Sequence, residues 1–414
     1  MPPKGHQAVR EAMEDLSAHR WTLEDLKTQA PPLAVFGAGV VGEAVVQLCR
    51  GAGVPVACFC DNSKAKAGTF VAKLPVLLPS ELSARFPNAA VLVAVADIQD
   101  VVAQLGGLGL ARWGTCHLLE DADLNVLQLD RPAEYVRFAV EACLTCHQSY
   151  LHPEKLFLRS VDVIITERCS LRCRDCSNLM QYYERPVDCD PAVLDGALEV
   201  LLGAIDEVND LRVIGGEPLM NRDCHRVVAR LSAHPKVKRV AVYTNGTIVP
   251  RPEQWDAFRN PKAIFLITDY GDLSRNLVKL TESLKREGVA FFVHRATAWA
   301  PCSGISRHGR TPGDLHQVFA QCCAKNLLTL ADDRLYRCPF LANAARLRAV
   351  PDLTADYVQL RADAVVTEMR RRLREFVQRD DYMEGCDWCE GRPWNAAEVT
   401  PAVQAPKPLP YRTA

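Results

Sequence analysis

Three closely spaced cysteines behind a short apolar segment constrain this chain more than any other feature. Cys169, Cys173 and Cys176 lie within eight residues, and Val161–Thr166 before them is apolar and β-branched. Such a segment predicts a buried strand, so the thiols leave its carboxyl end on a loop. In a barrel of alternating strands and helices, that end is where active sites form. Three thiolates on one loop are able to hold three irons of a [4Fe–4S] cluster and leave the fourth iron open.

The alternatives for these thiols are a zinc site, a disulfide or buried structural cysteines. Zinc usually takes four ligands from paired knuckles, and a disulfide is not expected in a chain without a secretory signal. The start, Met1-Pro-Pro-Lys-Gly-His6, has no apolar signal region, and no stretch is long and apolar enough to span a membrane. We therefore expect a cytoplasmic protein without a membrane partner.

Composition sets the broad class. A chain of 414 residues suggests two or three domains, and 49 lysines and arginines against 50 acidic residues give no field that would favour nucleic acid. In a reducing compartment, 17 cysteines indicate metal ligation more than disulfides. Six of them lie in apolar or isolated contexts and are interpreted as core or incidental: Cys49, Cys58, Cys60, Cys116, Cys189 and Cys224.

A second motif follows one helix later. Residues 190–205 predict an amphipathic helix with Asp190 as its N-cap. The next strand, Leu211–Ile214, runs into the turn Gly215, Gly216, Glu217 and Pro218. A glycine pair lets the backbone approach a ligand closely, and its carbonyls are able to accept hydrogen bonds from an ammonium group.

The Cys-x₃-Cys-x₂-Cys loop and the Gly-Gly-Glu-Pro turn together resemble the radical S-adenosylmethionine (radical SAM) superfamily, over roughly residues 160–390. The resemblance implies an α/β fold with a partial (β/α) TIM-type barrel at residues 159–300. It implies a [4Fe–4S] cluster on Cys169, Cys173 and Cys176, and SAM held by its amino group at Gly215–Pro218. The reduced cluster of such enzymes cleaves SAM to methionine and a 5′-deoxyadenosyl radical that abstracts hydrogen from a substrate. An electron donor such as flavodoxin or ferredoxin is implied as a partner.

Polar residues end the later strands of the predicted barrel. The strand 237–246 ends in Thr-Asn-Gly, and the resemblance makes Asn245 a candidate contact of the SAM ribose. The alternative is a simple turn, since Asn-Gly is common in turns. Asp269, His294 and Arg295 end two further strands, so we expect them to face a small-molecule substrate. The alternative for each of these three is a role in capping its loop.

The cysteines after residue 300 form a second group. Leu327–Leu330 and Arg334–Cys338 predict a β-hairpin, and Cys386-Asp-Trp-Cys389 follows a basic helix. This order resembles the twitch or SPASM extension of radical SAM enzymes, here residues 301–395, which carries an auxiliary iron–sulfur cluster. The resemblance assigns its ligands to Cys323, Cys338, Cys386 and Cys389. Cys322 competes with Cys323, and zinc suits four thiolates equally well. The proline-rich tail, residues 396–414, is expected to be disordered or draped.

A glycine-rich turn organises the N-terminal part. After a helical lead-in, residues 1–30, a strand meets the G-x-G-x-x-G sequence of Gly37, Gly39 and Gly42, and a second strand ends in Asp61. The glycines allow a tight turn and close approach to a phosphate, and the acid could bond a ribose. The pattern predicts a Rossmann-like nucleotide-binding domain at residues 31–120. Its ligand stays open between a nucleotide and a nucleotide-linked sugar, and a docking domain with an empty pocket is the alternative.

A helical connector, residues 121–158, contains Cys143-Leu-Thr-Cys146-His147, which matches a c-type haem attachment pattern. That chemistry needs export, and on a helix the two thiols are simply neighbours. We interpret the match as accidental.

Three functions remain open from the sequence. The first is a radical SAM oxidoreductase or epimerase that acts on a sugar or nucleotide-linked sugar, because a nucleotide-binding domain and one auxiliary site accompany the barrel. The second is a radical SAM enzyme that matures a peptide. The third is a zinc-stabilised nucleotide-binding scaffold without catalytic activity.

Overall fold

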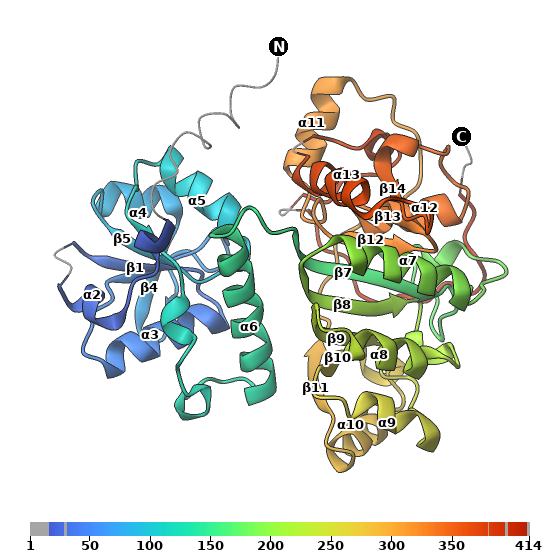
Figure 1. Cartoon of the computed structure of the whole chain (residues 1–414), viewed down its shortest axis with the longest axis horizontal. Coiled ribbons are helices and arrows are strands. Elements are labelled where there is room, and N and C mark those ends of the chain that lie inside the picture. Colours follow the sequence, from blue (N-terminus) through green and yellow to red (C-terminus); the bar gives the residue numbers. More distant parts are fainter. Residues whose placement is uncertain (1–15, 29–30, 380, 394–395, 412–414) are drawn as a thin grey trace. The chain divides into compact units, whose positions relative to one another are not determined.

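The chain forms two compact units, Met1–Lys155 and Leu156–Ala414 (Figure 1). The computed structural model describes residues 16–28, 31–379, 381–393 and 396–411. Most of the predicted helical lead-in, residues 1–15 and 29–30, therefore lies outside the described residues. Between these gaps lie the short helices η1 (Leu16–His19) and α2 (Leu23–Thr28). No helix in the described part of the chain is long and apolar enough to cross a membrane.

A six-stranded sheet forms the centre of the first unit. Its strand order is β3-β4-β2-β1-β5-β6, in which β3 is antiparallel to β4 and the other neighbours are parallel. The strand bounds are β1 Leu33–Phe36, β2 Cys58–Cys60, β3 Phe70–Val71, β4 Leu74–Leu77, β5 Ala90–Val93 and β6 Trp113–Gly114.

Helices cover both faces of this sheet (Figure 1). α3 (Val40–Gly51) and α6 (Ala133–Tyr150) pack on one face, where Val35, Phe59 and Leu92 point. α4 (Pro79–Arg85) and α5 (Ile98–Gly107) pack on the other. Because neighbouring residues of each strand face opposite ways and both faces are covered, the strands are apolar throughout.

An eight-stranded sheet organises the second unit, in the order β11-β10-β9-β8-β7-β12-β13-β14. The strands from β11 to β12 are parallel to their neighbours, and β13 and β14 are antiparallel. The bounds are β7 Phe157–Thr166, β8 Glu207–Gly215, β9 Val237–Thr244, β10 Ala263–Asp269, β11 Ala290–Arg295, β12 Leu328–Ala331, β13 Arg334–Tyr336 and β14 Tyr357–Gln359.

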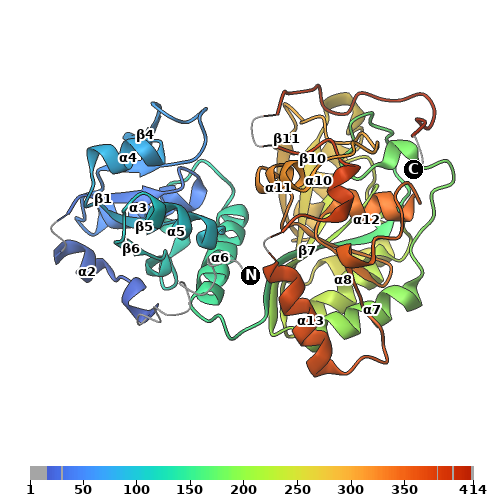
Figure 2. The ribbon, with the colours of Figure 1, turned by 90° about the horizontal axis from the view of Figure 1, so that it is seen from above.

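The two faces of this sheet belong to two different hydrophobic cores. Val161, Val163 and Ile165 of β7 join a core with α7, α8, α10 and α13, and α7 and α8 run side by side (Figures 1 and 2). Ile164 points to the other face and joins a core that contains Leu179, Tyr182 and residues after 300. The main helix bounds are α7 Pro191–Ala204, α8 Cys224–Ala233, α9 Trp255–Phe258, α10 Leu277–Arg286, α11 Pro312–Ala320, α12 Pro339–Arg346 and α13 Val366–Gln378.

Local predictions in this unit are confirmed. The Asp190 carboxylate accepts the backbone N–H groups of Ala192 and Val193, so it caps α7. β12 and β13 form the expected hairpin. However, β12 also pairs in parallel with β7, so the region 301–395 shares its sheet with the strands before it.

Candidate functional site

The glycine pair lies directly against the cysteine loop. Gly216 N–H donates to the Thr166 carbonyl at 3.1 Å, and Glu217 N–H donates to the Arg168 carbonyl at 2.8 Å. A Cβ atom on Gly216 would lie 2.3 Å from the Arg168 oxygen and 2.8 Å from Cys169 Cβ. Gly215 has φ +150°, and a Cβ there would lie 2.1 Å from the Thr166 oxygen. Only glycine allows this approach, because any side chain would separate the two segments.

The end of β9 meets the same loop. Asn245 donates from Nδ2 to Ser170 Oγ at 3.2 Å and points the same group at Cys169 Sγ, 3.7 Å away. Glu217 is fully buried, and its carboxylate accepts bonds from the Thr244 hydroxyl and from the backbone of Asn245 and Leu219. Burial raises the pKa of Glu217 to about 7. Its carboxylate therefore positions the end of β9. Pro218 begins the short helix η5, Pro218–Met220.

Tyr270 is a residue of this site that the sequence reasoning passed over. Burial raises its pKa, and the thiols Cys173, Cys176 and Cys169 are close enough to raise it further. Its ring packs edge-on against Trp299 at 5.6 Å between centroids. Its position immediately after Asp269, at the carboxyl end of β10, was the available signal.

The three predicted substrate-side residues lie farther out, at the edge of the sheet. Arg295 donates to Asp269 at 2.9 Å, and Gly271 N–H donates to the other carboxylate oxygen at 2.8 Å. Burial alone would raise the pKa of Asp269, but these hydrogen bonds outweigh it and lower the pKa overall. His294 and Arg295 are exposed on the edge strand β11. The structure thus joins Asp269 to Arg295 as a pair that braces the loop after β10.

A buried polar group occupies the inner face of β7 and β8. Asp162 and Arg212 are opposite each other in the sheet, with 3.9 Å between Oδ1 and a guanidinium nitrogen, and Arg212 also pairs with Asp210 at 2.6 Å. Burial raises the pKa of Asp162 to about 7. Ser160 Oγ, Asp162 Oδ1 and Arg392 Nε are buried without a hydrogen-bond partner among the described residues. The sequence signal was a serine and an aspartate alternating with valines in an apolar strand.

The thiols after residue 300 converge around one arginine. Cys322, Cys338 and Cys389 each accept a backbone N–H, from Ala324, Leu341 and Gly391 at 3.3–3.5 Å. Burial, with a smaller contribution from Cys322, raises the pKa of Cys386 to about 12 and of Cys389 to about 11. Burial alone would lower the pKa of Arg392. The nearby thiols outweigh it and raise the pKa overall; they are Cys302, Cys389, Cys338 and Cys322.

Of the adjacent pair Cys322 and Cys323, Cys323 is exposed to solvent, and its N–H donates to the Arg392 carbonyl at 2.9 Å. Cys322 is half-buried, and it contributes to raising the pKa of the Cys386 and Cys389 thiols. Of the two competing candidates, Cys322 is the more buried.

The sulfur spacing bears on the choice between zinc and a cluster. Two sulfurs bound to one zinc lie at most about 4.6 Å apart, because each Zn–S bond is about 2.3 Å. Among the described residues, no three of Cys169, Cys173 and Cys176, or of Cys322, Cys338, Cys386 and Cys389, bring their sulfurs within 4.8 Å of one another. In this structure, the sulfurs of neither set are close enough for three of them to bind one zinc ion.

The described part of the proline-rich tail closes over the cysteine loop. Ala405 N–H donates to the Arg172 carbonyl at 2.7 Å, and Arg174 N–H donates to the Val403 carbonyl at 2.8 Å. Gln404 donates from Nε2 to Cys173 Sγ at 3.3 Å. A cavity of about 220 Å³ beside the loop is lined in part by Cys169, Met180 and Gln404. Of the two states expected for the tail, this part of it is draped.

In the first unit, Asp61 is tied to the glycine turn. Its carboxylate accepts the N–H groups of Ala38 and Ser63, each at 2.9 Å, and pairs with Lys66 at 3.1 Å. Burial alone would raise the pKa of Asp61, but these partners outweigh it and lower the pKa overall. Gly39 is the N-cap of α3 and Gly37 has φ +109°. A Cβ on Gly42 would lie 1.8 Å from the Gly37 oxygen, so the turn requires glycine there.

Comparison with known proteins identifies the class of one stretch within the second unit. Residues 163–272 match the model of the Radical SAM superfamily, so this stretch of the chain is a domain of that superfamily. The match implies a [4Fe–4S] cluster and SAM as cofactors. The free thiols of Cys169, Cys173 and Cys176 are ligands of the kind that such a cluster takes.

Two curated relatives are similar to part of the chain. The GTP 3′,8-cyclase of Clostridium acetobutylicum is 29% identical over 100 residues, which are 22% of this chain and 30% of that protein. The GTP 3′,8-cyclase of Stenotrophomonas maltophilia (strain R551-3) is 36% identical over 90 residues, 21% of this chain and 26% of that protein. The chain thus spans less than a third of the length of these relatives.

Among solved structures, BtrN in complex with AdoMet and 2-DOIA is 16% identical and covers 56% of this chain and 93% of that chain. Its TM-score is 0.35, which is too low to support an argument.

Proposed function

We propose that the chain is a radical SAM enzyme that modifies a polar small molecule. The observation that carries the proposal is the direct packing of Gly215 and Gly216 on the loop of Cys169, Cys173 and Cys176. In this proposal the parallel strands β7–β11 and β12 form the partial barrel. The three thiols hold the cluster, and the backbone at Gly215–Pro218 receives the amino group of SAM. When bound and reduced, the cluster supplies the electron that cleaves SAM.

The surrounding residues take distinct roles in this proposal. Asn245 contacts the ribose of SAM from its place beside Cys169. Tyr270 and Trp299 offer an aromatic surface near the thiols for a planar ring. Glu217 holds the end of β9 in register with the cysteine loop and does not itself contact the cofactor. The predicted substrate-side residues lie at the edge of the proposed active site; they are Asp269, Arg295 and His294.

The second thiol set is proposed to hold an auxiliary iron–sulfur cluster, in a region of twitch or SPASM type. Its ligands are Cys322, Cys338, Cys386 and Cys389, with Cys322 in place of Cys323. Support comes from the half-buried position of Cys322 and from the buried Arg392, whose charge offsets part of the thiolate charge. Such a cluster could accept an electron from a substrate radical, which would make the net reaction an oxidation.

The substrate is proposed to be a sugar or a nucleotide-linked sugar. Buried polar atoms without a partner are costly unless a ligand satisfies them. Ser160 Oγ and Asp162 Oδ1 are such atoms, and hydroxyl groups of a sugar are able to bond both. The relatives named GTP 3′,8-cyclase act on a nucleotide, which favours the nucleotide-linked form.

For the first unit we propose a Rossmann-like domain that binds the nucleotide part of a ligand. The order β4-β2-β1-β5-β6 and the glycine turn between β1 and α3 support this assignment. Because Asp61 already bonds Ala38 and Lys66, the ribose contact would need another residue. Flavodoxin or ferredoxin is the proposed electron donor.

Anaerobic incubation with SAM and a reductant tests the proposal. We expect 5′-deoxyadenosine to form, and to form faster with one member of a panel of nucleotide-linked sugars. The variant with Cys169, Cys173 and Cys176 all changed to alanine should form none, yet it should retain the iron and sulfide of the second set. Failure of the wild-type protein to bind iron and sulfide would reject the enzyme, whereas cleavage unaffected by the panel would reject only the substrate class.

A further inference from the structure

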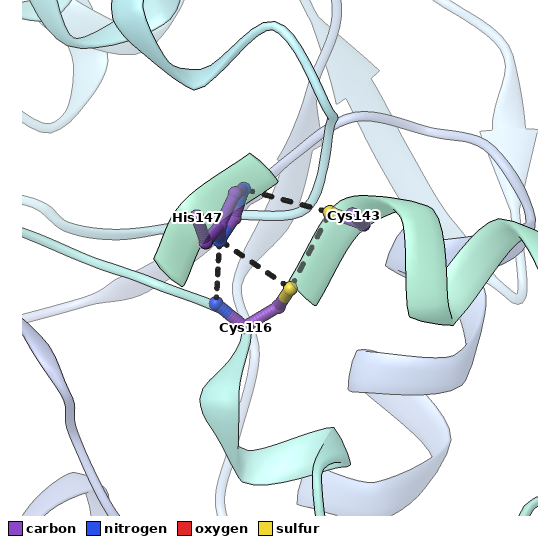
Figure 3. Close-up of side chains that lie close together, drawn as sticks. All are labelled: Cys116, Cys143 and His147. Carbon is purple, nitrogen blue, oxygen red and sulfur yellow. Dashed lines mark hydrogen bonds between the residues drawn. The ribbon is translucent and has the colours of Figure 1, made fainter. Parts of the chain in front are cut away.

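A second group of metal-ligating side chains lies in the first unit, outside the site described above. Cys116 Sγ lies 3.4 Å from Cys143 Sγ and 3.5 Å from His147 Nδ1, and Cys143 Sγ lies 3.5 Å from His147 Nε2 (Figure 3). All three residues are at most 1% exposed. In the described part of the chain, this is the one group of three or more such residues whose ligand atoms all lie within 4.8 Å of one another.

The group is assembled from separate parts of the fold. Cys116 follows β6 and precedes the short helix η2, His117–Leu119. Cys143 and His147 lie one turn apart on α6, so both project from the same face of that helix. His147 Nε2 lies 2.8 Å from the Val95 carbonyl, just after β5. The pattern Cys143-x-x-Cys146-His147 thus acquires a different meaning, because the third member is Cys116 and not Cys146.

The histidine is oriented as metal-binding histidines are. A ring N–H that donates to a backbone carbonyl leaves the other nitrogen unprotonated and aimed at the metal. Here Nε2–H donates to Val95 and Nδ1 faces Cys116. The Cys116 N–H also donates to Nδ1 at 3.2 Å, so a metal would replace that hydrogen bond by a coordinate bond.

Ordinary core cysteines of the same unit provide the contrast. Cys49 is also fully buried, but among the described residues it belongs to no group of three ligand side chains whose atoms lie within 4.8 Å of one another. Cys116 has a second thiol at 3.4 Å and an imidazole nitrogen at 3.5 Å. A buried thiolate beside a buried imidazole is an environment that a divalent cation stabilises.

We propose that Cys116, Cys143 and His147 bind one Zn²⁺ ion through two thiolates and Nδ1. Zn–S and Zn–N bonds of about 2.0–2.3 Å in a tetrahedron place neighbouring ligand atoms roughly 3.3–3.8 Å apart. The distances from Cys116 Sγ to Cys143 Sγ and to His147 Nδ1 lie in this range. Two thiolates balance the charge of the buried ion, and their two protons pass to solvent on binding. The fourth position is filled by water or another small ligand.

The site would brace the glycine turn of the same unit. Val95, whose carbonyl holds His147, lies against Gly37, since a Cβ there would be 2.5 Å from Val95 Cγ1. The ion would therefore fix the end of β5 that supports the first glycine of the turn.

The test measures zinc and iron by elemental analysis of the full chain, purified anaerobically. Cys143→Ser and Cys116→Ser should each lose about one zinc per chain relative to wild type and keep the same iron. Cys49→Ser is the matched control, because Cys49 belongs to the same core, and it should keep the zinc. Equal zinc in wild type and both variants overturns the proposal.

A second measurement remains informative if both serine variants fail to fold. Wild-type protein loaded with Co²⁺ should show thiolate-to-cobalt absorption, and His147→Gln should shift or remove it. Thiol counting on denatured wild-type protein separates the rival outcome. A deficit of two thiols, restored by a reductant, would mean a Cys116–Cys143 disulfide and would overturn the metal site.

Discussion

At the scale of single residues, two glycines decide whether the cysteine loop meets its neighbour. Gly216 touches the Arg168 carbonyl and Cys169 through its backbone, and it leaves no space for a methyl group. The requirement is local and steric, so an alanine substitution, which adds a single methyl group, tests it.

Gly216→Ala should disrupt the cluster site. The new Cβ would lie 2.3 Å from a backbone oxygen, so the two segments must separate. We expect a loss of about 1–3 kcal/mol in the free energy of unfolding and at least a tenfold fall in SAM cleavage. Anaerobic iron counting and 5′-deoxyadenosine assay measure both. Gly196→Ala on α7, where no atom lies within 4 Å of the added Cβ, is the control and should keep full iron.

The buried Asp162 should make stability depend on pH. Its pKa is raised to about 7 in the folded chain, against 3.8 ordinarily. Between these values the folded state keeps a proton that the unfolded state loses, so stability falls as pH rises from about 4 to about 7. Asp162→Asn removes this loss, on the order of a few kcal/mol. Urea unfolding at pH 5 and pH 8 measures it, and parallel profiles for the two proteins would contradict the prediction.

Sequence patterns predicted some of these residues and not others, for a physical reason. The spacing of Cys169, Cys173 and Cys176 and the glycine pair depend on local geometry, which the sequence carries directly. The choice between Cys322 and Cys323 depends on which way adjacent side chains turn when distant segments pack. Asp162 and Arg212 meet only once β7 and β8 are in register.

At the scale of elements, long-range pairing is what the sequence left undetermined. The hairpin of β12 and β13 follows from a short turn between two apolar runs. That β12 also pairs in parallel with β7 could not be deduced, because its partner lies far away in the chain. The tail is a similar case, since its proline content does not say that Val403, Gln404 and Ala405 bond the cysteine loop.

The tail contact should influence the cluster electronically. Hydrogen bonds to ligating sulfurs help to set the reduction potential of iron–sulfur clusters. Gln404→Ala removes the N–H group that points at Cys173 Sγ, so we expect a more negative midpoint potential. Val403→Ala, at an exposed neighbouring position, is the control. Anaerobic titration followed by electron paramagnetic resonance measures both, and equal potentials would mean that Gln404 only holds the loop in place.

At the scale of the whole molecule, the two units have separate hydrophobic cores. Phe59 is fully buried between β2 and α3 in the first unit, and Phe258 is fully buried beside β10 in the second. The core clusters of one unit include no residue of the other among the described residues. Each unit therefore has its own source of stability.

Calorimetry should accordingly resolve two unfolding transitions. Phe59→Ala should destabilise only the first unit and Phe258→Ala only the second. Each substitution should lower the free energy of unfolding of its own unit by about 3–5 kcal/mol and shift that unit's transition to lower temperature. The two variants serve as controls for each other. A single transition that both variants shift equally would show that the units unfold together.

The placement of β7 between β8 and β12 has a consequence for biosynthesis. β8 emerges soon after β7, whereas β12 begins at Leu328, long after β7 ends at Thr166. Until β12 is synthesised, the edge of β7 that will pair with it has unpaired backbone N–H and C=O groups. A strand from another chain can pair with this edge, which is a recognised route to aggregation. Slow translation between these strands would prolong that hazard, so the yield of native protein should depend on chaperones that shield this side during synthesis.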